Sequence, residues 1–364
     1  YISYFINNTY DTNAVNINNS PPHFLEVLFG IIKINTNNKK IKDNKKITNN
    51  KKIEDNILNN KLDNIYLLCT SINSGDYCVA NDLIKNMKNV KIITFENLNN
   101  NYNNYNKESI KIIFMDNRLC IPIYLKLKCK KIAWIRNWEK MWIKHLDFFD
   151  YVLCCNDSAK KYIESHNIKC NILPIGANFE ELQFNKNPIY DILVDCNLFN
   201  RRNIVEIVLK LVQETNYNIK IIGKGWNEYL SKDEFKLIEN NYDGFVLYDK
   251  IKEYYLNSKI IIDDCNFIAI HFGSVNKRVL DAISCKRLVL SNNLNGSREL
   301  LDNKICYYKT YDNITYLINK YLNNPILYQN KVTELYNYSI KYLNNKYLLN
   351  IIMNNYIDLK IIIQ

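Results

Sequence analysis

Three loops in the second half of the chain carry basic residues where a hydrophobic strand gives way to a helix. Arg201 and Arg202 occupy the first loop, Lys224 the second, and Lys277 and Arg278 the third. A helix N-terminus already carries a partial positive charge and free N–H groups, so cations there are repelled unless an anion binds. Because arginine and lysine bind phosphate oxygens through charged hydrogen bonds, this arrangement predicts a phosphate-bearing ligand such as a diphosphate.

Short apolar segments of strand length alternate with helix-length segments along most of the chain. A first series runs from "NIYLLCT" to "NILPIGA", and a second runs from "YDILVDC" through "GFVLYDK" to "ICYYKT". This alternation predicts an α/β fold with two Rossmann-like parallel-sheet domains that face each other across a cleft. Ligands of such sheets bind beyond the carboxyl ends of the strands, so the loops after the strands are the candidate site.

The 364 residues exceed the size of one ordinary core and divide into five expected parts. These are an N-terminal extension or the tail of a preceding module over 1–35, a Lys/Asn-rich linker over 36–63, an N-terminal domain over 64–182, a C-terminal domain over 183–330, and helices packing back toward the N-terminal domain over 331–364. The chain begins with Tyr1 rather than Met, from which we expect a longer polypeptide.

The loops after the other strands add polar candidates. Gly75 and Asp76 follow the first strand, Arg136 follows "KIAWI", and His271 is expected near a strand end in the second domain. Some of these candidates also have a purely structural interpretation. Gly-Lys-Gly turns are common without a ligand, the arginine pair suits a solvated surface equally well, and a histidine such as His271 is more often a structural polar residue.

The net charge is +11, from 48 Lys and Arg against 37 Asp and Glu, and it favours an anionic partner. Much of the excess lies in the Lys/Asn tract over residues 37–56, which is typical of a solvated segment. A basic nucleic-acid-binding protein therefore stays an alternative with little support. The abundance of Asn, Ile, Lys and Tyr indicates an AT-rich genome, as in some giant viruses, and does not bear on the fold.

Eleven cysteines occur without a Cys-x-x-Cys pair, and the chain has four histidines. This pattern favours a reducing compartment, so that we expect a cytoplasmic protein, and it predicts no zinc site. No run of about eighteen apolar residues predicts a membrane span.

The segment "NKRVLDAISCKRLVLSNNLNGSRELLDN" resembles the C-terminal half of the group 1 glycosyltransferases, which have the GT-B fold. The segments "IKIIGKGW" and "IAWIRNW" resemble other parts of the same family. The likeness runs in order from Asn64 to Tyr347. It implies transfer of a sugar from a nucleotide-diphosphate sugar, bound mainly to the C-terminal domain, to a glycan or protein-linked acceptor. It implies no metal or other cofactor.

The resemblance also implies roles for individual residues. It places Lys277 and Arg278 beside the donor, and Asp281 takes the place of a family glutamate that hydrogen-bonds the nucleotide ribose. We expect catalytic roles for Arg278, Lys277 and Arg136, the last because it follows a strand and should face the cleft. The substrate-binding residues are Gly75, Asp76, Arg201, Arg202, Gly223, Lys224, His271, Ser274, Asn276, Asp281 and Glu299. The cations among them would stabilise the negative charge that develops on the departing nucleoside diphosphate.

The chain departs from the family pattern at one carboxylate. Gly273 stands eight positions before Asp281, where many relatives carry the first of two glutamates. A catalytically silent sugar-nucleotide-binding relative therefore stays an alternative, as does another two-domain sugar-nucleotide enzyme such as an epimerase. A general base, if the reaction uses one, would be Asp76, Asp116 or neither of these.

Overall fold

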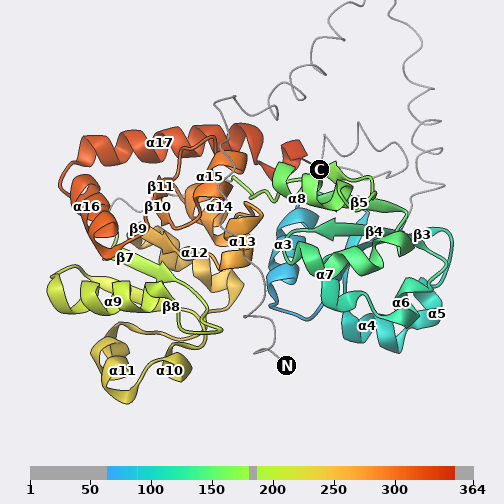
Figure 1. The fold of residues 1–364 in the computed structure, drawn as a ribbon, viewed down its shortest axis with the longest axis horizontal. Helices are drawn as coiled ribbons and strands as arrows, with labels where there is room; N and C mark the ends of the chain where they lie inside the picture. Colours follow the sequence, from blue (N-terminus) through green and yellow to red (C-terminus); the bar gives the residue numbers. More distant parts are fainter. Residues whose placement is uncertain (1–63, 88, 180–186, 349–364) are drawn as a thin grey trace, which may run out of the picture. The chain divides into compact units, whose positions relative to one another are not determined.

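The computed structural model describes residues 64–87, 89–179 and 187–348. The predictions for residues 1–35 and 36–63, and for the last part of 331–364, lie outside the described residues. Within them the chain forms two parallel β-sheets, each surrounded by helices (Figure 1). The predicted α/β fold with two Rossmann-like domains is confirmed.

The N-terminal sheet contains six strands in the order β2-β1-β3-β4-β5-β6, and every neighbouring pair is parallel. Its strands are β1 (Asn64–Cys69), β2 (Val90–Thr94), β3 (Ile110–Phe114), β4 (Lys130–Ile135), β5 (Tyr151–Cys154) and β6 (Asn171–Ile172). Its α-helices are α3 (Gly75–Ile84), α4 (Phe95–Asn100), α5 (Tyr102–Tyr105), α6 (Pro122–Leu125), α7 (Glu139–Trp142) and α8 (Asp157–Glu164). The strands are continuous apolar runs because helices bury both faces of a parallel sheet.

The C-terminal sheet contains five parallel strands in the order β11-β10-β9-β7-β8. They are β7 (Tyr190–Asp195), β8 (Ile219–Ile222), β9 (Ser258–Asp263), β10 (Leu288–Ser291) and β11 (Cys306–Tyr307). The helices are α9 (Asn203–Glu214), α10 (Trp226–Tyr229), α11 (Lys232–Ile238), α12 (Tyr248–Leu256), α13 (Phe267–His271), α14 (Lys277–Ser284), α15 (Leu294–Leu300), α16 (Tyr311–Leu322) and α17 (Pro325–Tyr342).

Two local predictions in the second series are wrong. The segment "GFVLYDK" is no strand, since its first residues form an extended loop and Tyr248 begins α12. Phe245 and Leu247 are 45% and 46% exposed, so this loop does not bury the alternating side chains that a sheet strand would bury. His271 ends helix α13 rather than a strand, because the Asn266 side chain accepts a hydrogen bond from Ala269 N and starts a helix there.

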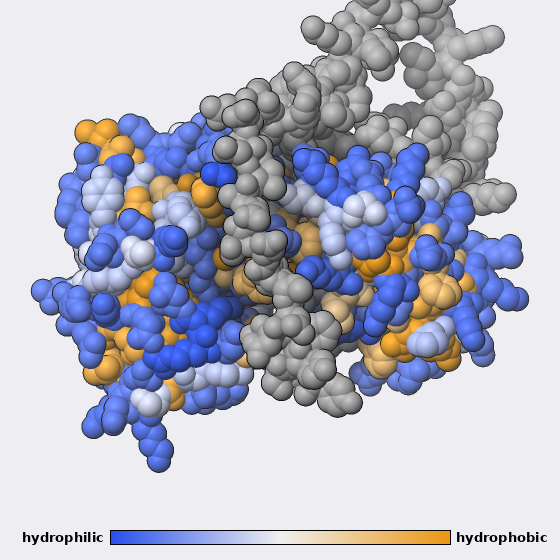
Figure 2. All heavy atoms as spheres, in the orientation of Figure 1, coloured by the Kyte–Doolittle hydropathy of each residue, from blue (hydrophilic) through white to orange (hydrophobic). Residues whose placement is uncertain are grey.

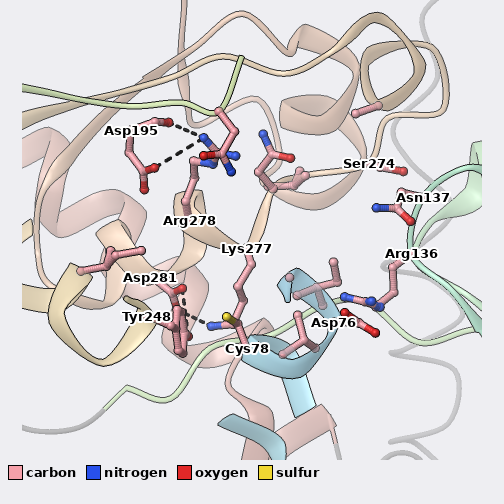
Figure 3. Close-up of a pocket in the computed structure, with 18 of the residues that line it drawn as sticks. Asp76, Cys78, Arg136, Asn137, Asp195, Tyr248, Ser274, Lys277, Arg278 and Asp281 are labelled. Carbon is pink, nitrogen blue, oxygen red and sulfur yellow. Dashed lines mark hydrogen bonds and ion pairs between the residues drawn. The ribbon is translucent and has the colours of Figure 1, made fainter. Parts of the chain in front are cut away.

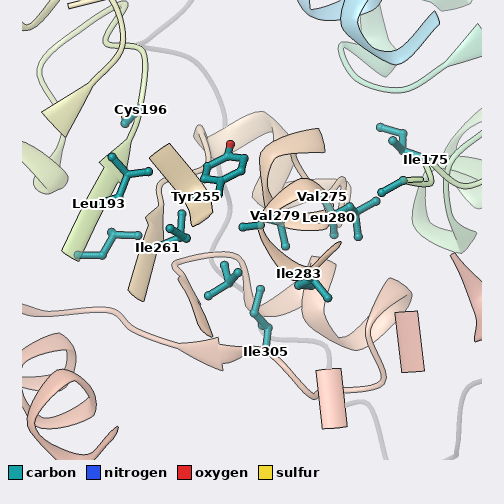
Figure 4. Close-up of a cluster of buried hydrophobic side chains, with 14 of the residues drawn as sticks. Ile175, Leu193, Cys196, Tyr255, Ile261, Val275, Val279, Leu280, Ile283 and Ile305 are labelled. Atoms are coloured by element: carbon teal, nitrogen blue, oxygen red, sulfur yellow. The ribbon is translucent and has the colours of Figure 1, made fainter. Parts of the chain in front are cut away.

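Helix α14, which carries the basic pair of the third loop, is fixed by its apolar face. Val279, Leu280 and Ile283 are buried in one cluster with Leu193 of β7 and Ile261 of β9 (Figure 4). Each such side chain contributes about 1.5–3 kcal/mol when it leaves water. The packing therefore sets where the first turn of α14, and every polar group on it, lies relative to the carboxyl ends of the strands.

The chain returns to the end of the N-terminal domain after its longest described helix. Helix α17 packs on α14 and α16 of the C-terminal domain. Beyond it, Ala177 N donates to Leu343 O, and Asn345 N donates to Ala177 O, both at 3.0 Å. These two bonds join the segment that follows β6 to the segment that follows α17.

The face of the molecule shown in Figure 2 is mainly polar. Hydrophilic side chains dominate the face shown in Figure 2, and hydrophobic ones gather there in separate groups. No helix within the described ranges combines the length and the apolar character that crossing a membrane requires.

Candidate functional site

A cavity of about 320 Å³ lies where loops from the carboxyl ends of both sheets meet. The N-terminal domain contributes the loops after β1, β3 and β4, and the C-terminal domain contributes the loops after β7 and β9 and the loop before α12. Its volume lies at the lower end of the range of small-molecule sites, about 300–1,000 Å³. The cavity lies where parallel sheets place their ligands.

The predicted site residues that line this cavity come from both domains. They are Gly75, Asp76, Arg136, Ser274, Asn276, Lys277, Arg278 and Asp281. The whole lining carries four acidic side chains (Asp76, Asp116, Asp195 and Asp281) and four basic ones (Arg118, Arg136, Lys277 and Arg278). The lining is therefore balanced in charge, which suits a small ligand with one anionic part better than a long polyanion.

The first turn of α14 opens on the cavity. Its N-cap residue, Asn276, makes no side-chain hydrogen bond to the helix; its Nδ2 donates instead to Asp263 Oδ1 at 2.8 Å. The first N–H groups of α14 are therefore not covered by a side-chain cap and remain suited to an anion. From this turn Lys277 and Arg278 extend in opposite directions (Figure 3).

Arg278 lies against the C-terminal sheet. Its Nη1 donates to the main-chain oxygen of Asp195 and lies 3.6 Å from Asp195 Oδ1, and its Nε lies 3.5 Å from Asp263 Oδ1. Burial lowers the pKa of Arg278, but the two carboxylates more than offset this, so the pKa is raised overall. Arg278 thus stays charged at the cavity wall.

Lys277 reaches the other domain. Its Nζ lies 2.7 Å from Asp82 Oδ2 on α3, and it also bonds the Asp281 carboxylate. The Tyr248 hydroxyl lies 3.0 Å from Asp82 and 3.1 Å from Asp281, so its single proton is shared between two carboxylates. Burial and the negative charge of Asp82 raise the pKa of Asp281, whereas Lys277 lowers it.

Asp76 and Asp116, the two candidate bases, are bound by other groups. Asp76 accepts hydrogen bonds from Thr70 N at 2.6 Å and from Thr70 Oγ1 at 2.9 Å. Asp116 accepts from Arg118 Nε at 2.8 Å and from Arg118 Nη2 at 2.9 Å. Their oxygens hold the ends of β1 and β3 in place, which makes a base role for either less favourable.

Helix α7 begins with a buried acid that the sequence interpretation missed. Glu139 is 1% exposed, and its Oε1 accepts a hydrogen bond from Ser274 Oγ at 3.1 Å. Burial raises the pKa of Glu139 to about 7. In the sequence, Glu139 could have been noticed as an acid that follows Arg136 and Trp138 in the segment after β4. Trp138 has a left-handed φ of 56° and lines the cavity.

Arg136 is buried, and its guanidinium group uses only some of its hydrogen-bond donors. It is 7% exposed, its Nη2 donates to Met115 O at 2.6 Å, and its Nε has no hydrogen-bond partner. The guanidinium also lies 5.8 Å from the Trp134 ring centroid. Arg136 is therefore a cation at the cavity wall that keeps donors available.

The remaining predicted residues do not line the cavity; they are Arg201, Arg202, Gly223, Lys224, His271 and Glu299. Arg201 pairs with Glu206 and Glu234 at an exposed position. Arg202 Nε lies 2.8 Å from Asp264 Oδ2, and His271 is exposed.

The Gly-Lys-Gly turn does not line the cavity itself but contacts residues that do. Lys224 N donates to Asn197 Oδ1 at 2.8 Å, and Asn197 lines the cavity. The Lys224 ammonium lies 4.1 Å from the ring centroid of Phe245, another lining residue. Gly223 has φ 126°, and a Cβ there would lie 2.1 Å from Cys196 O. The turn therefore packs against the loop after β7 and holds it in position at the cavity.

A carboxylate does lie beside Gly273, although that position has no side chain. Gly273 has φ 65°, and a Cβ built on it would lie 3.1–3.4 Å from the Glu299 carboxyl group. Glu299 also accepts hydrogen bonds from Ser158 N, at 3.1 Å, and from Ser158 Oγ, and burial raises its pKa. Glu299 thus joins α15 to the first turn of α8 in the other domain.

No group of three or more metal-ligating side chains is found among the described residues. The carboxylates around the cavity are bound to lysine, arginine, hydroxyl or amide groups, as described above. The donor set therefore does not point to a particular metal ion.

Comparisons with known proteins agree with this architecture. Residues 201–337 match the sequence profile of a family described as "Glycosyl transferase-like". The matched residues cover most of the C-terminal domain. No protein with a curated description matches the sequence.

Solved structures show which fold the described residues share. HepE (Alr3699) of Anabaena, crystallised with UDP-glucose, superposes with a TM-score of 0.62 at 7% identity, covering 81% of this chain and 99% of that one. A glycosyltransferase from Rickettsia africae gives 0.54 at 12% identity, covering 81% and 98%. TarM of S. aureus gives 0.53 at 14% identity, covering 76% of this chain and 57% of TarM.

These likenesses show a shared GT-B fold for the described part of the chain. The predicted resemblance and the predicted enzyme class, a glycosyltransferase, are confirmed by the family match and the fold together.

Proposed function

We propose that this glycosyltransferase moves a sugar from a nucleoside-diphosphate sugar, bound in the cavity, to a hydroxyl group of a glycan or protein-linked acceptor. The observation that carries the proposal is the first turn of α14, which lacks a side-chain cap and opens on the cavity beside Arg278. Amide N–H groups and a fixed guanidinium stabilise charge that develops on a departing diphosphate without reorganising.

The donor takes the C-terminal wall of the cavity in this proposal. The diphosphate lies at the first turn of α14, and Asp281 accepts hydrogen bonds from the ribose hydroxyls. Lys277 joins the diphosphate only if it leaves Asp82, its present partner at 2.7 Å. The crystal structure of HepE with UDP-glucose makes a UDP-sugar the first donor to test.

The acceptor takes the N-terminal wall, where Gly75, Arg136 and Trp138 line the cavity. Trp138 is 42% exposed there, and an exposed indole suits the apolar face of a sugar ring. Transfer needs no metal ion in this proposal, so that EDTA should leave the rate unchanged. We place the protein in the cytoplasm, because eleven cysteines without a pairing pattern suit a reducing compartment.

Thermal unfolding in the presence of UDP-, GDP- and dTDP-sugars tests donor binding. A ligand that binds the folded state raises the melting temperature by mass action. The sugar that shifts it most then serves in an assay of nucleoside diphosphate release. The proposal is wrong if none of these donors shifts the melting temperature and none is turned over.

A donor-binding protein without transfer is the second candidate. Gly273 lacks the expected carboxylate, and Lys277 is held by two acids. A melting shift without nucleoside diphosphate release would favour this candidate. Nucleic-acid binding, by contrast, gains no support from a cavity with equal numbers of acidic and basic side chains.

A further inference from the structure

Buried polar atoms without a partner concentrate at one loop. Among the described side chains four such atoms make no hydrogen bond, namely Arg136 Nε, Glu139 Oε2, Arg202 Nε and Ser339 Oγ. Arg202 Nε still forms an ion pair with Asp264 Oδ2 at 2.8 Å, so the other three atoms are the ones without any partner. Two of them lie directly after β4, Arg136 in the loop and Glu139 as the first residue of α7, and Glu139 is the acid among the four residues. A buried carboxylate oxygen without a hydrogen bond is costly, so the surrounding structure must hold it there for another reason.

Glu139 is joined to the cavity by a serine of the other domain. Ser274 is 4% exposed and lines the cavity, and its Oγ donates to Glu139 Oε1 at 3.1 Å. Ser274 stands two residues before Asn276, the N-cap of α14, and thus beside the proposed diphosphate position. Figure 3 shows Ser274 on the same side of the pocket as Asn137 and Arg136.

The acidic side chains that line the cavity already have hydrogen-bond or ion-pair partners. Asp76 accepts two hydrogen bonds and Asp116 accepts three, and Asp195 and Asp281 lie against Arg278 and Lys277. Glu139 differs because its neutral serine partner leaves one oxygen free and compensates no charge. Of the acids discussed, it is the one best able to take up a proton.

We propose that Ser274 and Glu139 form a proton relay between the two domains, in which Glu139 receives the proton that the attacking acceptor hydroxyl releases. The acceptor oxygen bonds to the anomeric carbon as the bond from that carbon to the diphosphate oxygen breaks. The diphosphate leaves with the bonding electron pair. The hydroxyl proton passes to Ser274 Oγ while the serine proton passes to Glu139 Oε1. Ser274 meets the substrate, and Glu139 is a positioning residue that acts through it. This inference rests on the proposed function.

The surroundings of Glu139 suit a proton acceptor that works near neutral pH. Burial raises its pKa to about 7, and hydrogen bonds from a backbone N–H and from Ser274 lower it in part. Tyr162 of α8 and Cys155 after β5 lie near it. Burial raises the pKa of both groups, and the negative charge of Glu139 adds to each rise. Arg136 also lies near Cys155 and offsets the rise of its pKa in part. A base is most efficient when its pKa lies close to the working pH.

The test uses the donor that raises the melting temperature most, with water as the acceptor, and measures nucleoside diphosphate release against pH. The variants are Glu139→Gln, Ser274→Ala and the double variant; Glu164→Gln, an exposed acid on α8, is the control. Melting curves show that each variant is folded. The relay predicts a wild-type rate that falls toward acid pH as Glu139 becomes protonated, with the same profile in Glu164→Gln.

The relay predicts that Glu139→Gln loses this acid limb and about a hundredfold or more in rate, the usual contribution of general-base catalysis. Ser274→Ala should lose as much, and the double variant no more than either. An unchanged rate and acid limb in Glu139→Gln, or a normal rate in Ser274→Ala, overturns the relay but leaves the proposed function standing. A wild-type protein that neither binds nor cleaves any donor overturns both.

Discussion

Lys277 Nζ lies 2.7 Å from Asp82 Oδ2, so that an ion pair connects helix α14 of the C-terminal domain with helix α3 of the N-terminal domain. Its neighbour Arg278 turns the other way, to Asp195 and Asp263 at the ends of β7 and β9. The two adjacent cations therefore have different roles. Lys277 holds the domains together beside the cavity, and Arg278 supplies positive charge at its wall.

Removal of Lys277 should destabilise the fold more than removal of Asp82. The variant Lys277→Met leaves Asp82 and Asp281 buried and close together, with only the half-exposed Lys85 beside Asp82. Loss of one partner of a buried ion pair typically costs about 3–5 kcal/mol. Asp82→Asn costs less, because Lys277 keeps Asp281. Urea unfolding of both variants and of the double variant measures this, and the double variant should recover part of the loss. Equal, small losses in both single variants would contradict the buried ion pair.

Arg278 and Arg201 should differ in their effect on turnover. Arg278→Ala removes a donor from the proposed diphosphate position and should lower kcat on the order of a hundredfold. Arg201→Ala should leave kcat close to that of the wild type, since Arg201 pairs with Glu206 and Glu234 outside the cavity. Steady-state kinetics of donor cleavage compare the two. A similar loss in both variants would show that Arg201 meets the donor after all.

The sequence predicts the fold well because local patterns decide it. Continuous apolar runs such as β3 and β9 are buried along their length, and a helix-length segment follows most of them. The exception is "GFVLYDK", whose apolar residues resemble a strand but form a cavity-lining loop. A run of apolar residues does not reveal whether it faces a sheet neighbour or a ligand.

The site is predictable only in part because charge pairing is a long-range property. Gly75, Asp76, Ser274, Asn276 and Arg278 line the cavity as the loop rule predicts. The same rule also selects residues such as Arg201, whose partner Glu234 lies on a different helix, α11. The rule does not identify Glu139, because the hydrogen bond that connects Glu139 to the cavity comes from a residue more than one hundred positions away in the other domain.

Glu139 should make the stability of the protein depend on pH. Its pKa is about 7 in the folded protein against 4.5 for an ordinary glutamate, so the folded state retains a proton that the unfolded chain releases. The stabilisation is complete below the unfolded pKa and is lost as the pH rises through 7. The difference between the two pKa values corresponds to about 3 kcal/mol.

The variant Glu139→Gln removes this dependence. Relative to the wild type, its free energy of unfolding should rise between about pH 5 and about pH 8. Urea unfolding at several pH values measures the difference. Glu164→Gln, which changes an exposed acid, should show no such trend. A difference that is constant with pH would mean that Glu139 is already ionised at acid pH in the folded protein.

Gly223 tests whether the Gly-Lys-Gly turn supports the cavity. A Cβ at this position would lie 2.1 Å from Cys196 O, and the φ of 126° is unfavourable for any other residue. Gly223→Ala should therefore displace the loop after β7, with Asn197 on it, and lower both stability and donor affinity. Forcing a methyl group into such a space typically costs about 1–3 kcal/mol, to which the backbone strain adds.

Gly244→Ala is the matched control, because Gly244 has a φ of 73° but nothing within 4 Å of the added Cβ. It carries the backbone strain without the collision, about 1–2 kcal/mol. Urea unfolding and the donor-induced melting shift compare the two variants. Gly223→Ala should lose more stability than Gly244→Ala and should also lose donor affinity, because the loop that it moves lines the cavity. If donor affinity is equal in both, the turn supports the fold and not the site.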